Sequence, residues 1–513
     1  MRDRNQVVLP LNLEICIPEG DFVFKVAEIC EELDYTELFN TYARNWRKVN
    51  PITLFEIIVY GYMKHKYSGR EIAEACKTDI RFMWLLNGEP APSHATISRF
   101  EDERLSGVIE GLFYQFVEKL YEMGEVKFKN LFVDGTKIEA YANKYTFVWK
   151  KTVEKNLAKL EKKISALLPV LSERYGFSET VSLEECYEIL CRQAQWINLV
   201  FASGKGKRKT QLQKDIECLK EYIDKRAEYG SHLGKFGNRG SFSKTDTDAT
   251  FMHMKEDHMK NGQLKPGYNI QIGVESEYIV GVSSFSNRTD VSTLIPFLKR
   301  IRSHTNRKFE NIIADAGYES SENYLYLEEN EQGCFIKPQN YEISKKKSYK
   351  ANPYTVENMP YNAKRDEYTC PNGRKLKYRS ESEKTTENKY KVTTKYYSND
   401  TCGRCPHRAK CHKSKKGYRT VQVNQVILAH RPKTLEALIS EEGARLRMNR
   451  SIQVEGVFGV LKEDYGFRRF LTRGTKNIET QFFLLAFALN IEKLCNRTKK
   501  GRLGTELFKL DAS

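Results

Sequence analysis

The chain is organised around the segment Arg450-Ser-Ile-Gln-Val-Glu-Gly-Val-Phe-Gly-Val-Leu-Lys462. Its apolar residues recur at helical spacing, which predicts an amphipathic helix with one buried side. Glu455 lies at the edge of the apolar stripe. Because each helical residue turns the chain by about 100°, the step from Glu455 to Lys462 nearly closes two turns and puts both charges on one face. A phosphodiester with its divalent cation could use both groups, but an ordinary half-buried helix with charged edges has the same pattern.

Two earlier segments each carry a run of apolar residues into an aspartate. They are Asn130-Leu-Phe-Val-Asp134-Gly-Thr and Asn311-Ile-Ile-Ala-Asp315-Ala-Gly-Tyr. Such a run followed closely by glycine predicts a buried strand with the acid at its carboxyl end, where open α/β sheets bind their ligands. Two strand-end aspartates and a late helical glutamate are the carboxylates that a two-metal phosphoryl-transfer site needs.

Together these motifs resemble those of the DDE transposases of bacterial insertion sequences. The resemblance is carried by Asp134-Gly-Thr, Asp315-Ala-Gly-Tyr and the spacing from Glu455 to Lys462, and it extends over about residues 45 to 495. It implies an RNase H-like catalytic core in which the catalytic residues Asp134, Asp315 and Glu455 hold Mg²⁺ or Mn²⁺. It also implies double-stranded DNA as the partner, both as terminal inverted repeats and as target.

In one part of the motif, the sequence differs from the family pattern. The related Tyr-Arg-Glu-Lys pattern would place tyrosine at 448 and arginine at 451, where this chain has Met448 and Ser451. Arg450 could replace the arginine, but on a regular helix it lies about 140° from Glu455. We therefore expect Arg450 to bind DNA less directly than Lys462.

Further basic residues are candidates for contacts to DNA phosphates, which make binding sensitive to salt. Lys137 follows Asp134 closely enough to reach a phosphate, and a basic patch follows the Glu455 helix. The patch consists of Arg468, Arg469 and Arg473.

Composition favours a nucleic-acid partner. The 513 residues include 84 Lys+Arg and 67 Asp+Glu, which gives a formal net charge of +17 and favours a polyanion. The sequence has no apolar run long enough to span a membrane, and its start lacks the apolar core of a signal peptide. We expect a soluble bacterial protein in the cytoplasm, associated with the nucleoid and not with a membrane.

The first hundred residues are helical in pattern. A helix is expected from Pro51, and Ser68-Gly-Arg-Glu71 has the form of a capping box before a helix over 72–85. The turn and polar helix that follow are typical of a helix-turn-helix, although a plain helical bundle with the same residues as caps fits equally well. The resemblance favours binding of terminal repeats through Ser93, His94, Thr96 and Arg99.

Two insertions are expected in the catalytic sheet. Apolar residues at spacing three and four over 150–228 predict two helices paired as a hairpin, followed by a flexible Gly, Ser, Asn and Lys-rich loop over 229–247. Asp246 and Asp248 end this loop. They are rivals for the first catalytic acid, but the lack of a preceding apolar strand favours a turn or cap role.

The second insertion contains a cysteine cluster. Its spacing, with Cys402 and Cys405 in Cys-x-x-Cys, suits a closed, structural tetrahedral zinc site, in which His407 or His412 could replace a cysteine. Disulfides are the competing interpretation, which the expected cytoplasmic location disfavours. The full set of expected zinc ligands is Cys370, Cys402, Cys405 and Cys411.

We therefore expect an α/β protein. An RNase H-like catalytic core is interrupted by a helical insertion and a β-rich, cysteine-containing insertion, and is preceded by an all-α, helix-turn-helix-like domain. The three-strand meander followed by alternating helix and strand supports this core. The expected segments are the helical DNA-binding domain 1–125, the first catalytic strand region 126–148, the helical hairpin and loop 149–247, the continued core 248–340, the zinc-ribbon-like insertion 341–430, the C-terminal part of the core 431–496, where the apolar helix covers the sheet, and a polar, mobile tail 497–513.

The expected function is that of a DNA transposase. It would cleave DNA at insertion-sequence ends and transfer the strands to target DNA, acting as a dimer when it brings two ends together. Two alternatives remain open from the sequence: an RNase H-like nuclease or resolvase that cuts without joining, and a catalytically silent DNA-binding regulator.

Overall fold

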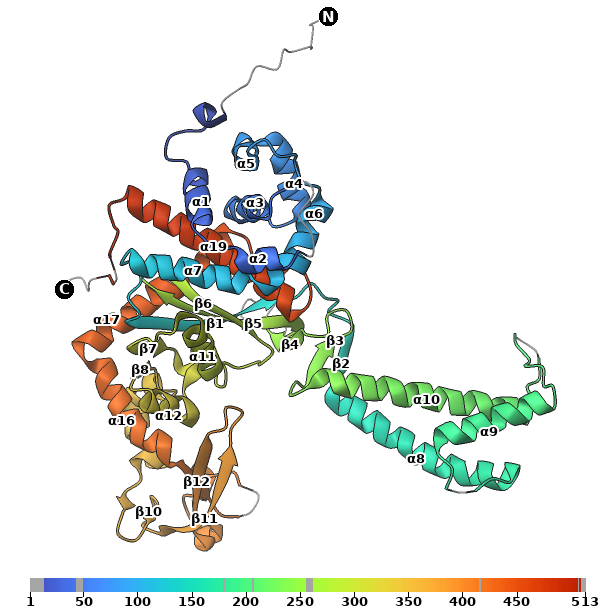
Figure 1. Cartoon of the computed structure of the whole chain (residues 1–513). Coiled ribbons are helices and arrows are strands. Elements are labelled where there is room, and N and C mark those ends of the chain that lie inside the picture. The colour runs from blue at the N-terminus through green and yellow to red at the C-terminus, as the bar shows by residue number, and fades with distance from the viewer. Residues whose placement is uncertain are drawn as a thin grey trace, which may run out of the picture. The chain divides into compact units, whose positions relative to one another are not determined.

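The computed structural model in Figure 1 describes residues 13–42, 49–178, 180–204, 207–254, 262–414, 417–505 and 507–508. It is a mixed α/β fold, as the sequence predicts. The residues fall into two compact units, Met1–Ile138 with Asn269–Ser513, and Glu139–Tyr268.

A mixed sheet lies at the centre of the first unit. Its strands lie in the order β6 (Tyr278–Phe285), β5 (Leu264–Glu275), β1 (Asn130–Glu139), β7 (Asn311–Ala314) and β8 (Gly333–Ile336), and β4 (Thr250–His253) pairs with the first residues of β5. Strand β7 runs parallel to both β1 and β8, whereas β5 and β6 form the predicted antiparallel hairpin. The apolar runs of β1 and β7 are buried, because helices cover the sheet from both sides.

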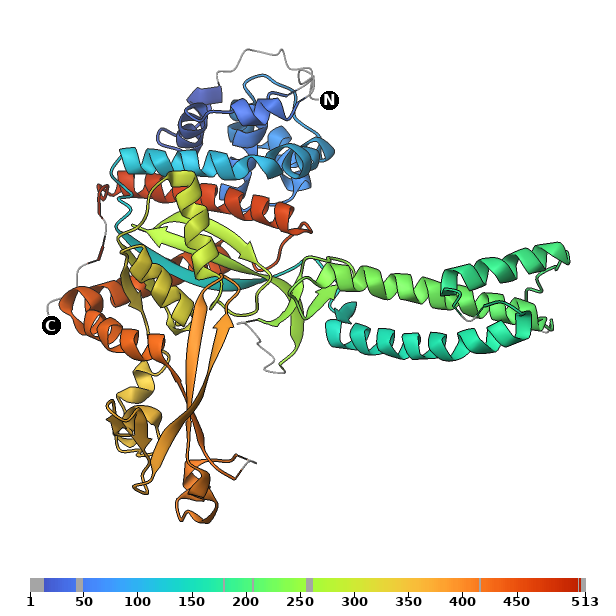
Figure 2. The same cartoon turned by 60° about the horizontal axis from the view of Figure 1, so that its bottom comes forward.

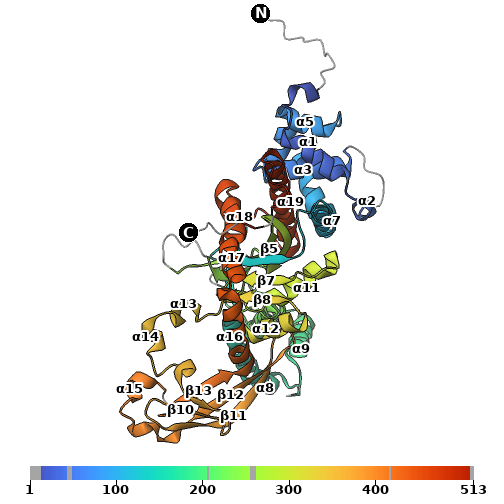
Figure 3. The same cartoon turned by 90° about the vertical axis from the view of Figure 1, so that its left-hand side faces the viewer.

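The helices on the two sides come from different parts of the chain. Helix α11 (Leu294–Thr305) packs on β6, and α17 (Glu441–Arg450) packs on β7 from the opposite face (Figure 3). Helix α12 (Ser321–Glu329) and α16 (Gln425–Ile439) both contact β8. The sheet is therefore covered by helices that precede the cysteine-containing insertion in the sequence and by helices that follow it.

Helix α19 (Thr475–Lys499) covers the sheet and also carries the N-terminal helices. It contacts β6, α1 (Phe22–Glu31), α3 (Pro51–Met63) and α7 (Ile109–Glu122), and it lies beside α7 in Figures 1 and 2. The run from Phe482 to Ala488 is buried throughout. A helix that is apolar on every side must be surrounded by protein, and here the sheet and the N-terminal helices surround it.

Aromatic rings join these helices. The ring of Phe487 on α19 lies 5.4 Å from that of Phe55, 5.8 Å from that of Phe113 and 5.5 Å from that of Phe116. Such pairs add to the free energy gained by burying the rings.

The N-terminal helices include the predicted capping box. Ser68 accepts from the backbone N–H of Glu71, whose side chain accepts from Ser68 in return. The helix predicted over 72–85 is instead two helices, α4 (Gly69–Thr78) and α5 (Ile80–Leu86). The break occurs at Asp79, which is extended and caps α5 by accepting from Arg81 N–H at 2.9 Å.

The second unit contains three long helices where the sequence predicts two. They are α8 (Lys150–Tyr175), α9 (Leu183–Trp196) and α10 (Gln211–Phe236), and they share an apolar core. The prediction of a flexible loop over 229–247 is wrong for the first residues of this range, because α10 continues to Phe236. Tyr229, Leu233 and Phe236 recur at helical spacing and pack with Val148, Val153 and Phe242, so burial outweighs the nearby glycines.

The cysteine-containing insertion is β-rich, as expected. Its antiparallel sheet has the order β13 (Thr420–Asn424), β12 (Lys391–Ser398), β11 (Lys375–Thr385), β10 (Glu367–Thr369) and β9 (Tyr361–Asn362). Strands β11 and β12 form a long twisted hairpin in Figure 2. A small core that includes Tyr368, Leu376 and Tyr397 holds the sheet together.

Shorter elements complete the described chain. They are η1 (Leu13–Cys16), α2 (Thr36–Asn40), α6 (His94–Arg99), the π-helix η2 (Phe100–Arg104), η3 (Leu105–Gly107), β2 (Phe147–Trp149), β3 (Ser241–Ser243), β4 (Thr250–His253), η4 (Ala316–Tyr318), α13 (Tyr341–Ser344), α14 (Lys347–Lys350), η5 (Val356–Asn358), η6 (Asp400–Arg404), α15 (Arg408–Cys411), the π-helix η7 (Ser451–Glu455), α18 (Gly456–Gly459) and the π-helix η8 (Val460–Asp464).

One arginine ties three helices together. Arg300 on α11 donates to the carboxylate of Glu110 on α7 at 2.5 and 2.7 Å and to that of Glu479 on α19 at 2.7 and 2.8 Å. Burial favours the neutral acid at Glu479, but hydrogen bonds from Arg300 and Ser284 outweigh it and lower the pKa of this carboxyl group.

Replacing Arg300 with methionine should therefore destabilise the first unit. The Arg300→Met variant leaves two largely buried carboxylates without their shared cation, which lowers the free energy of unfolding by about 3 kcal/mol. Equilibrium urea unfolding measures the change. The matched control is Arg302→Met on the same helix, where the exposed guanidinium contacts Asn330 and the change should be small. Equal effects of the two substitutions would contradict the role of Arg300.

The same contact predicts a pH dependence. Because the pKa of Glu479 is lower in the folded state than its ordinary value of 4.5, its contribution to stability is complete above that value. The contribution is lost as the pH falls through the lowered pKa. The difference in unfolding temperature between wild type and Arg300→Met should therefore be greatest near neutral pH and shrink below about pH 4. A difference that grows on acidification would be evidence against this sign.

Candidate active site

The two predicted strand-end aspartates lie side by side. Val133 of β1 pairs with Ala314 of β7 in the parallel register, so Asp134 and Asp315 follow at the same edge of the sheet. Asp134 is 7% exposed, and its carboxylate accepts from the Gly135 N–H at 2.8 Å. Asp315 caps the short helix η4 by accepting from the Gly317 N–H at 2.8 Å. The prediction that Asp315 follows the end of a buried strand is confirmed, whereas the prediction that Asp134 ends its strand is wrong, because β1 continues to Glu139.

Glu455 reaches this edge through a change in helix type. After α17 the chain forms the π-helix η7, and Glu455 is its last residue. Hydrogen bonds in a π-helix join residues five apart, so Arg450 and Glu455 lie on one face and not 140° apart as a regular helix would place them. The guanidinium of Arg450 donates to Glu455 Oε1 at 2.7 Å. The expectation of a regular helix at Arg450 is thus wrong.

Arg450 also connects the helix to the sheet. Its Nη1 lies 3.7 Å from Asp134 Oδ2, while its Nη2 binds Glu455. The side chains of Arg450 and Asp134 are 19% and 10% exposed, whereas that of Glu455 is 52% exposed. One largely buried cation therefore offsets the charge of an acid on the sheet and an acid on the helix.

A third aspartate, which the sequence analysis missed, lies at the same edge. Asp290, in the loop between β6 and α11, accepts at Oδ1 from Asn269 at 2.7 Å and from Gln271 at 2.9 Å. A Cβ at Gly135 would lie 2.9 Å from this Oδ1, so only glycine leaves room for the carboxylate there. Asp290 follows no apolar strand, and its sequence setting gave no signal.

A buried tyrosine marks where these groups meet. Tyr318 is fully buried, and its hydroxyl donates to Gln271 Oε1. Burial raises the pKa of Tyr318 well above its ordinary value, and the carboxylates of Asp290, Asp134 and Asp315 raise it further. Arg450 acts in the opposite direction. Tyr318 therefore remains a neutral hydrogen-bond donor beside these charged groups.

The donor set suits a hard divalent cation. Carboxylate oxygens are the ligands that Mg²⁺ and Mn²⁺ prefer in proteins. In the part of the chain that the structure describes, however, no three His, Cys, Asp or Glu side chains are gathered as a metal site. Glu455 instead accepts from Arg450, whose other terminal nitrogen lies 3.7 Å from Asp134.

The predicted DNA-binding residues near the acids fall into two groups. Lys137 on β1 and Lys462 on η8 are partly buried. The three arginines of the basic patch are exposed, and Arg468 donates to Glu463 at 2.6 and 2.7 Å. This ion pair offsets part of the positive charge of the patch, in which Arg469 and Arg473 are also exposed.

The N-terminal candidates lie on the short helix α6. Ser93 is its N-cap and accepts from the Thr96 N–H at 3.2 Å, and the two hydroxyls are 2.9 Å apart. His94 and Arg99 are exposed. Ser93 thus has the capping role that the sequence left open, and Ser93, His94 and Arg99 are exposed whereas Thr96 is half-buried.

The rival acids of the second unit have structural roles. Asp246 is 4% exposed and accepts from the Tyr268 hydroxyl at 2.9 Å through both oxygens. It also accepts from the Asp248 N–H at 3.3 Å. These contacts fit the turn role that the sequence favours.

The cysteine cluster is reduced. All twelve cysteines of the chain are free, which excludes the disulfide interpretation for this structure. Cys402 Sγ contacts Asn399 O at 3.2 Å, and Arg419 contacts Cys411 Sγ at 3.2 Å. The neighbouring His412 has a buried Nε2 without a hydrogen-bond partner. As placed, these side chains do not form a closed set of zinc ligands among the described residues.

Comparisons with family models find one match in the N-terminal part of the chain and one in the C-terminal part. Residues 11–103 match the Transposase domain (DUF772), and residues 369–495 match the Transposase DDE domain, a stretch that contains Glu455 and Lys462. No curated protein and no solved structure matches the chain. No helix within the described ranges is long and apolar enough to cross a membrane. Transposase models match on either side of the two aspartate strands, and together they support a DDE-type insertion-sequence transposase.

Proposed function

We propose that this chain catalyses metal-dependent cleavage of DNA at insertion-sequence ends and transfer of the cut strands to target DNA. The observation that carries the proposal is the meeting of Asp134 and Asp315 at one sheet edge with Arg450, which binds Glu455. Three acids from distant parts of the sequence thus converge towards one edge, and two of them share a cation.

The catalytic core is proposed to be RNase H-like. The support is the strand order β6-β5-β1-β7-β8, in which an antiparallel hairpin extends a parallel set of strands. Asp134 follows the residues of β1 that pair with β7, and Asp315 follows the carboxyl end of β7, so the two acids come after the same end of the parallel pair, where ligands of such sheets bind. The proposed segments keep the expected boundaries, with 1–125 as the DNA-binding domain and 431–496 as the last part of the core.

Asp134, Asp315 and Glu455 would hold Mg²⁺ or Mn²⁺, which supplies a Lewis acid and lowers the pKa of a bound water or hydroxyl group. Asp134 and Asp315 are held in place by backbone N–H groups, so their orientation is set before substrate binds. Arg450 reduces the repulsion among the acids and presents a guanidinium suited to a phosphodiester. Tyr318 contributes a neutral phenol that keeps Gln271 aligned beside Asp290.

Lys462, Lys137 and the basic patch would contact DNA phosphates. Their support is position: Lys137 is on the strand of Asp134, and Lys462 and the arginines follow Glu455. Terminal repeats would be bound by the N-terminal helices through Ser93, His94, Thr96 and Arg99, of which Ser93, His94 and Arg99 are exposed. Two chains would act together when two transposon ends are joined.

A structural zinc ion remains part of the proposal. Its support is the ligand spacing of Cys370, Cys402, Cys405 and Cys411, their reduced state and the unpartnered Nε2 of His412. It has no part in the chemistry of the sheet edge.

The catalytic assignment is tested with Asp134→Asn, Asp315→Asn and Glu455→Gln. Each variant should lower the rate of Mg²⁺-dependent cleavage of the element's flanking inverted repeats by at least about a hundredfold, because each removes a charged metal ligand. Binding of the same DNA should persist. Asp248→Asn is the matched control and should cleave like wild type. Full cleavage by Asp134→Asn, or loss with Asp248→Asn, would refute the assignment.

The same assay separates the three functions. Cleaved and joined products from wild type support the transposase. Cleavage without joining, in the presence of target DNA, would favour the nuclease or resolvase. Binding with neither activity would favour the silent regulator.

Zinc is tested by metal analysis of protein purified without chelators. We expect about one zinc per chain, lost in the Cys402→Ser, Cys405→Ser double variant, because a tetrahedral site does not survive removal of two thiolates. Cys334→Ser, which changes a cysteine on β8, is the control and should retain zinc. Wild-type protein without zinc would remove this part of the proposal.

A further inference from the structure

We propose that the C-terminal residues Arg502–Thr505 and Phe508, together with the β5–β6 turn, form a brace that holds the π-helix η7 in register and so positions Arg450 and Glu455. The inference rests on the proposed function for its catalytic consequence. The contacts of the brace are structural, and they can be tested separately from activity.

The π-helix needs support from outside. Its wider turn is rarer and less favourable than that of an α-helix, so such segments persist where the surrounding structure holds them. In this chain the π-turn has a defined result, because it brings Arg450 onto the face of Glu455. If the segment returned to an α-helix, the two side chains would move about 140° apart and the contact would be lost.

Apolar packing restrains this segment on one side, where Val454 is fully buried. On another side, a partly open pocket of about 290 Å³ lies beside the Glu455 helix and α19, lined by Gln453, Gly456, Val457 and Val460 and by Asn490 and Lys493. Side chains fill this side less completely, so packing restrains the helix less there. Hydrogen bonds therefore add to the restraint on its register.

The first of these bonds joins the helix to the C-terminal segment. Asn449 is fully buried immediately before Arg450. Its Oδ1 accepts from the Phe508 N–H at 2.8 Å, and its amide donates to Phe508 O at 3.1 Å and to Arg445 O at 2.9 Å. A side-chain amide thus pairs with both backbone groups of Phe508. This result also corrects the expectation that the whole polar tail is mobile.

The second bond joins the π-helix to the β5–β6 turn. Gln453 is 1% exposed, and its Oε1 accepts from the Glu277 N–H at 3.0 Å. Ser276 and Glu277 have φ angles of 54° and 67°, which residues other than glycine, asparagine and aspartate rarely adopt. Such a turn needs its own restraints if it is to present the Glu277 N–H in a fixed direction.

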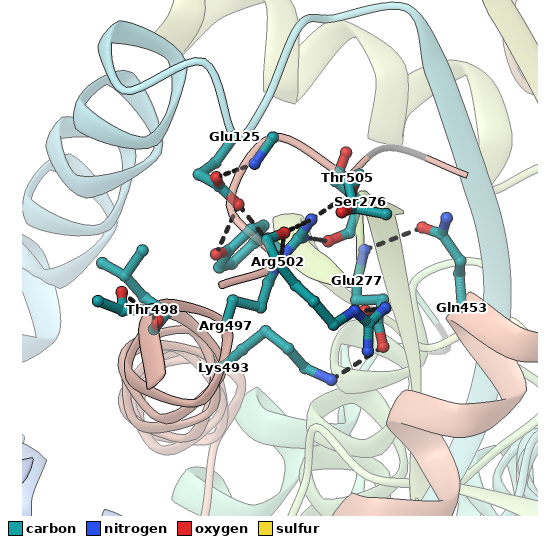
Figure 4. Close-up of polar contacts among 12 residues, drawn as sticks. Glu125, Ser276, Glu277, Gln453, Lys493, Arg497, Thr498, Arg502 and Thr505 are labelled. Atoms are coloured by element: carbon teal, nitrogen blue, oxygen red, sulfur yellow. Dashed lines mark hydrogen bonds and ion pairs between the residues drawn. The ribbon is translucent and has the colours of Figure 1, made fainter. Parts of the chain in front are cut away.

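Figure 4 shows those restraints around Arg497. Arg497 is 2% exposed and donates to Ser276 O at 2.5 Å, to Arg502 O at 3.2 and 3.3 Å, and to Thr505 O. Glu125 offsets its charge at 3.3 Å. A single buried guanidinium therefore fixes the turn and the C-terminal segment to each other.

The carboxylate of Glu277 is held as well. Lys493 lies 3.0 Å from Oε1 and Arg502 lies 3.7 Å from Oε2, so α19 and the C-terminal segment both bind it. Phe508 joins the same cluster through Arg502, whose guanidinium lies 5.3 Å from the centre of its ring, so the bonds at Asn449 and at Gln453 are anchored together. Asn449 and Gln453 act on the site through Arg450 and Glu455 and are positioning residues.

The test uses two substitutions at one position of the full chain. Phe508→Pro removes the N–H that Asn449 accepts, whereas Phe508→Ala keeps both backbone groups. In hydrogen–deuterium exchange, peptides covering 449–456 should exchange faster in Phe508→Pro than in wild type or Phe508→Ala. Unchanged exchange in Phe508→Pro would overturn the brace whether or not the protein cleaves DNA.

The catalytic consequence is measured in single-turnover cleavage of the inverted repeats. Phe508→Pro and Gln453→Met should cleave at least about tenfold more slowly, since small misplacements of reacting groups lower rates strongly. DNA binding and the unfolding temperature should stay close to those of Phe508→Ala. Wild-type cleavage rates in both variants would overturn the positioning role.

A double-mutant cycle with Arg450→Lys tests whether the brace affects cleavage through Arg450. If the brace acts through Arg450, Phe508→Pro should slow the Arg450→Lys enzyme much less than it slows wild type. Fully additive effects would overturn this route. If wild type itself cleaves no DNA, the proposed function fails, while the exchange experiment still decides the fate of the brace.

Discussion

The burial of α19 on every side is the constraint on which the rest of the first unit depends. One side of this helix covers β6 of the sheet, and the other receives α1, α3 and α7. The apolar run from Phe482 to Ala488 could not be solvated on either side, so the N-terminal helices and the catalytic sheet share one core. The ion pairs of Arg300 with Glu110 and Glu479 add specific polar contacts between the helices that meet in this core. The same helix contributes Lys493 and Arg497 to the brace behind the active site.

The active site gathers negative charge and limits its repulsion in different ways. Asp290 is hydrogen-bonded by two amides, Asp134 and Asp315 accept from backbone N–H groups, and Arg450 lies between Asp134 and Glu455. Each contact compensates a carboxylate for the water that burial removes. The half-exposed Glu455 is the least constrained of the acids, and its position depends on a π-helix whose register is set by hydrogen bonds at some distance from the reacting groups. The position of Glu455 near the sheet edge therefore depends on contacts made by the C-terminal residues of the chain.

Much of this arrangement follows from local patterns. The apolar runs before Asp134 and Asp315 predicted buried strands, and the structure places the two acids next to each other, with Asp315 after the end of β7 and Asp134 within the longer β1. The capping box at Ser68 and the β5–β6 hairpin were also predicted, because caps and alternating strands depend on neighbouring residues. Local patterns failed where packing between distant segments decides. Helix α10 continues through a glycine-containing stretch because Phe236 is buried against Phe242, and Asp290 joins the site through amides on β5.

By itself, the sequence determined the acids, the strands that carry two of them and the apolar helix that closes the core, because periodicity and turn residues act over a few positions. Only the tertiary structure decided how these parts meet. It set Arg450 against Glu455 by turning one segment of helix into a π-helix, brought Asp290 to the same edge, and joined Phe508 to Asn449. These outcomes depend on hydrogen bonds and close approaches between residues far apart in the chain, and such contacts leave no periodic trace in the sequence.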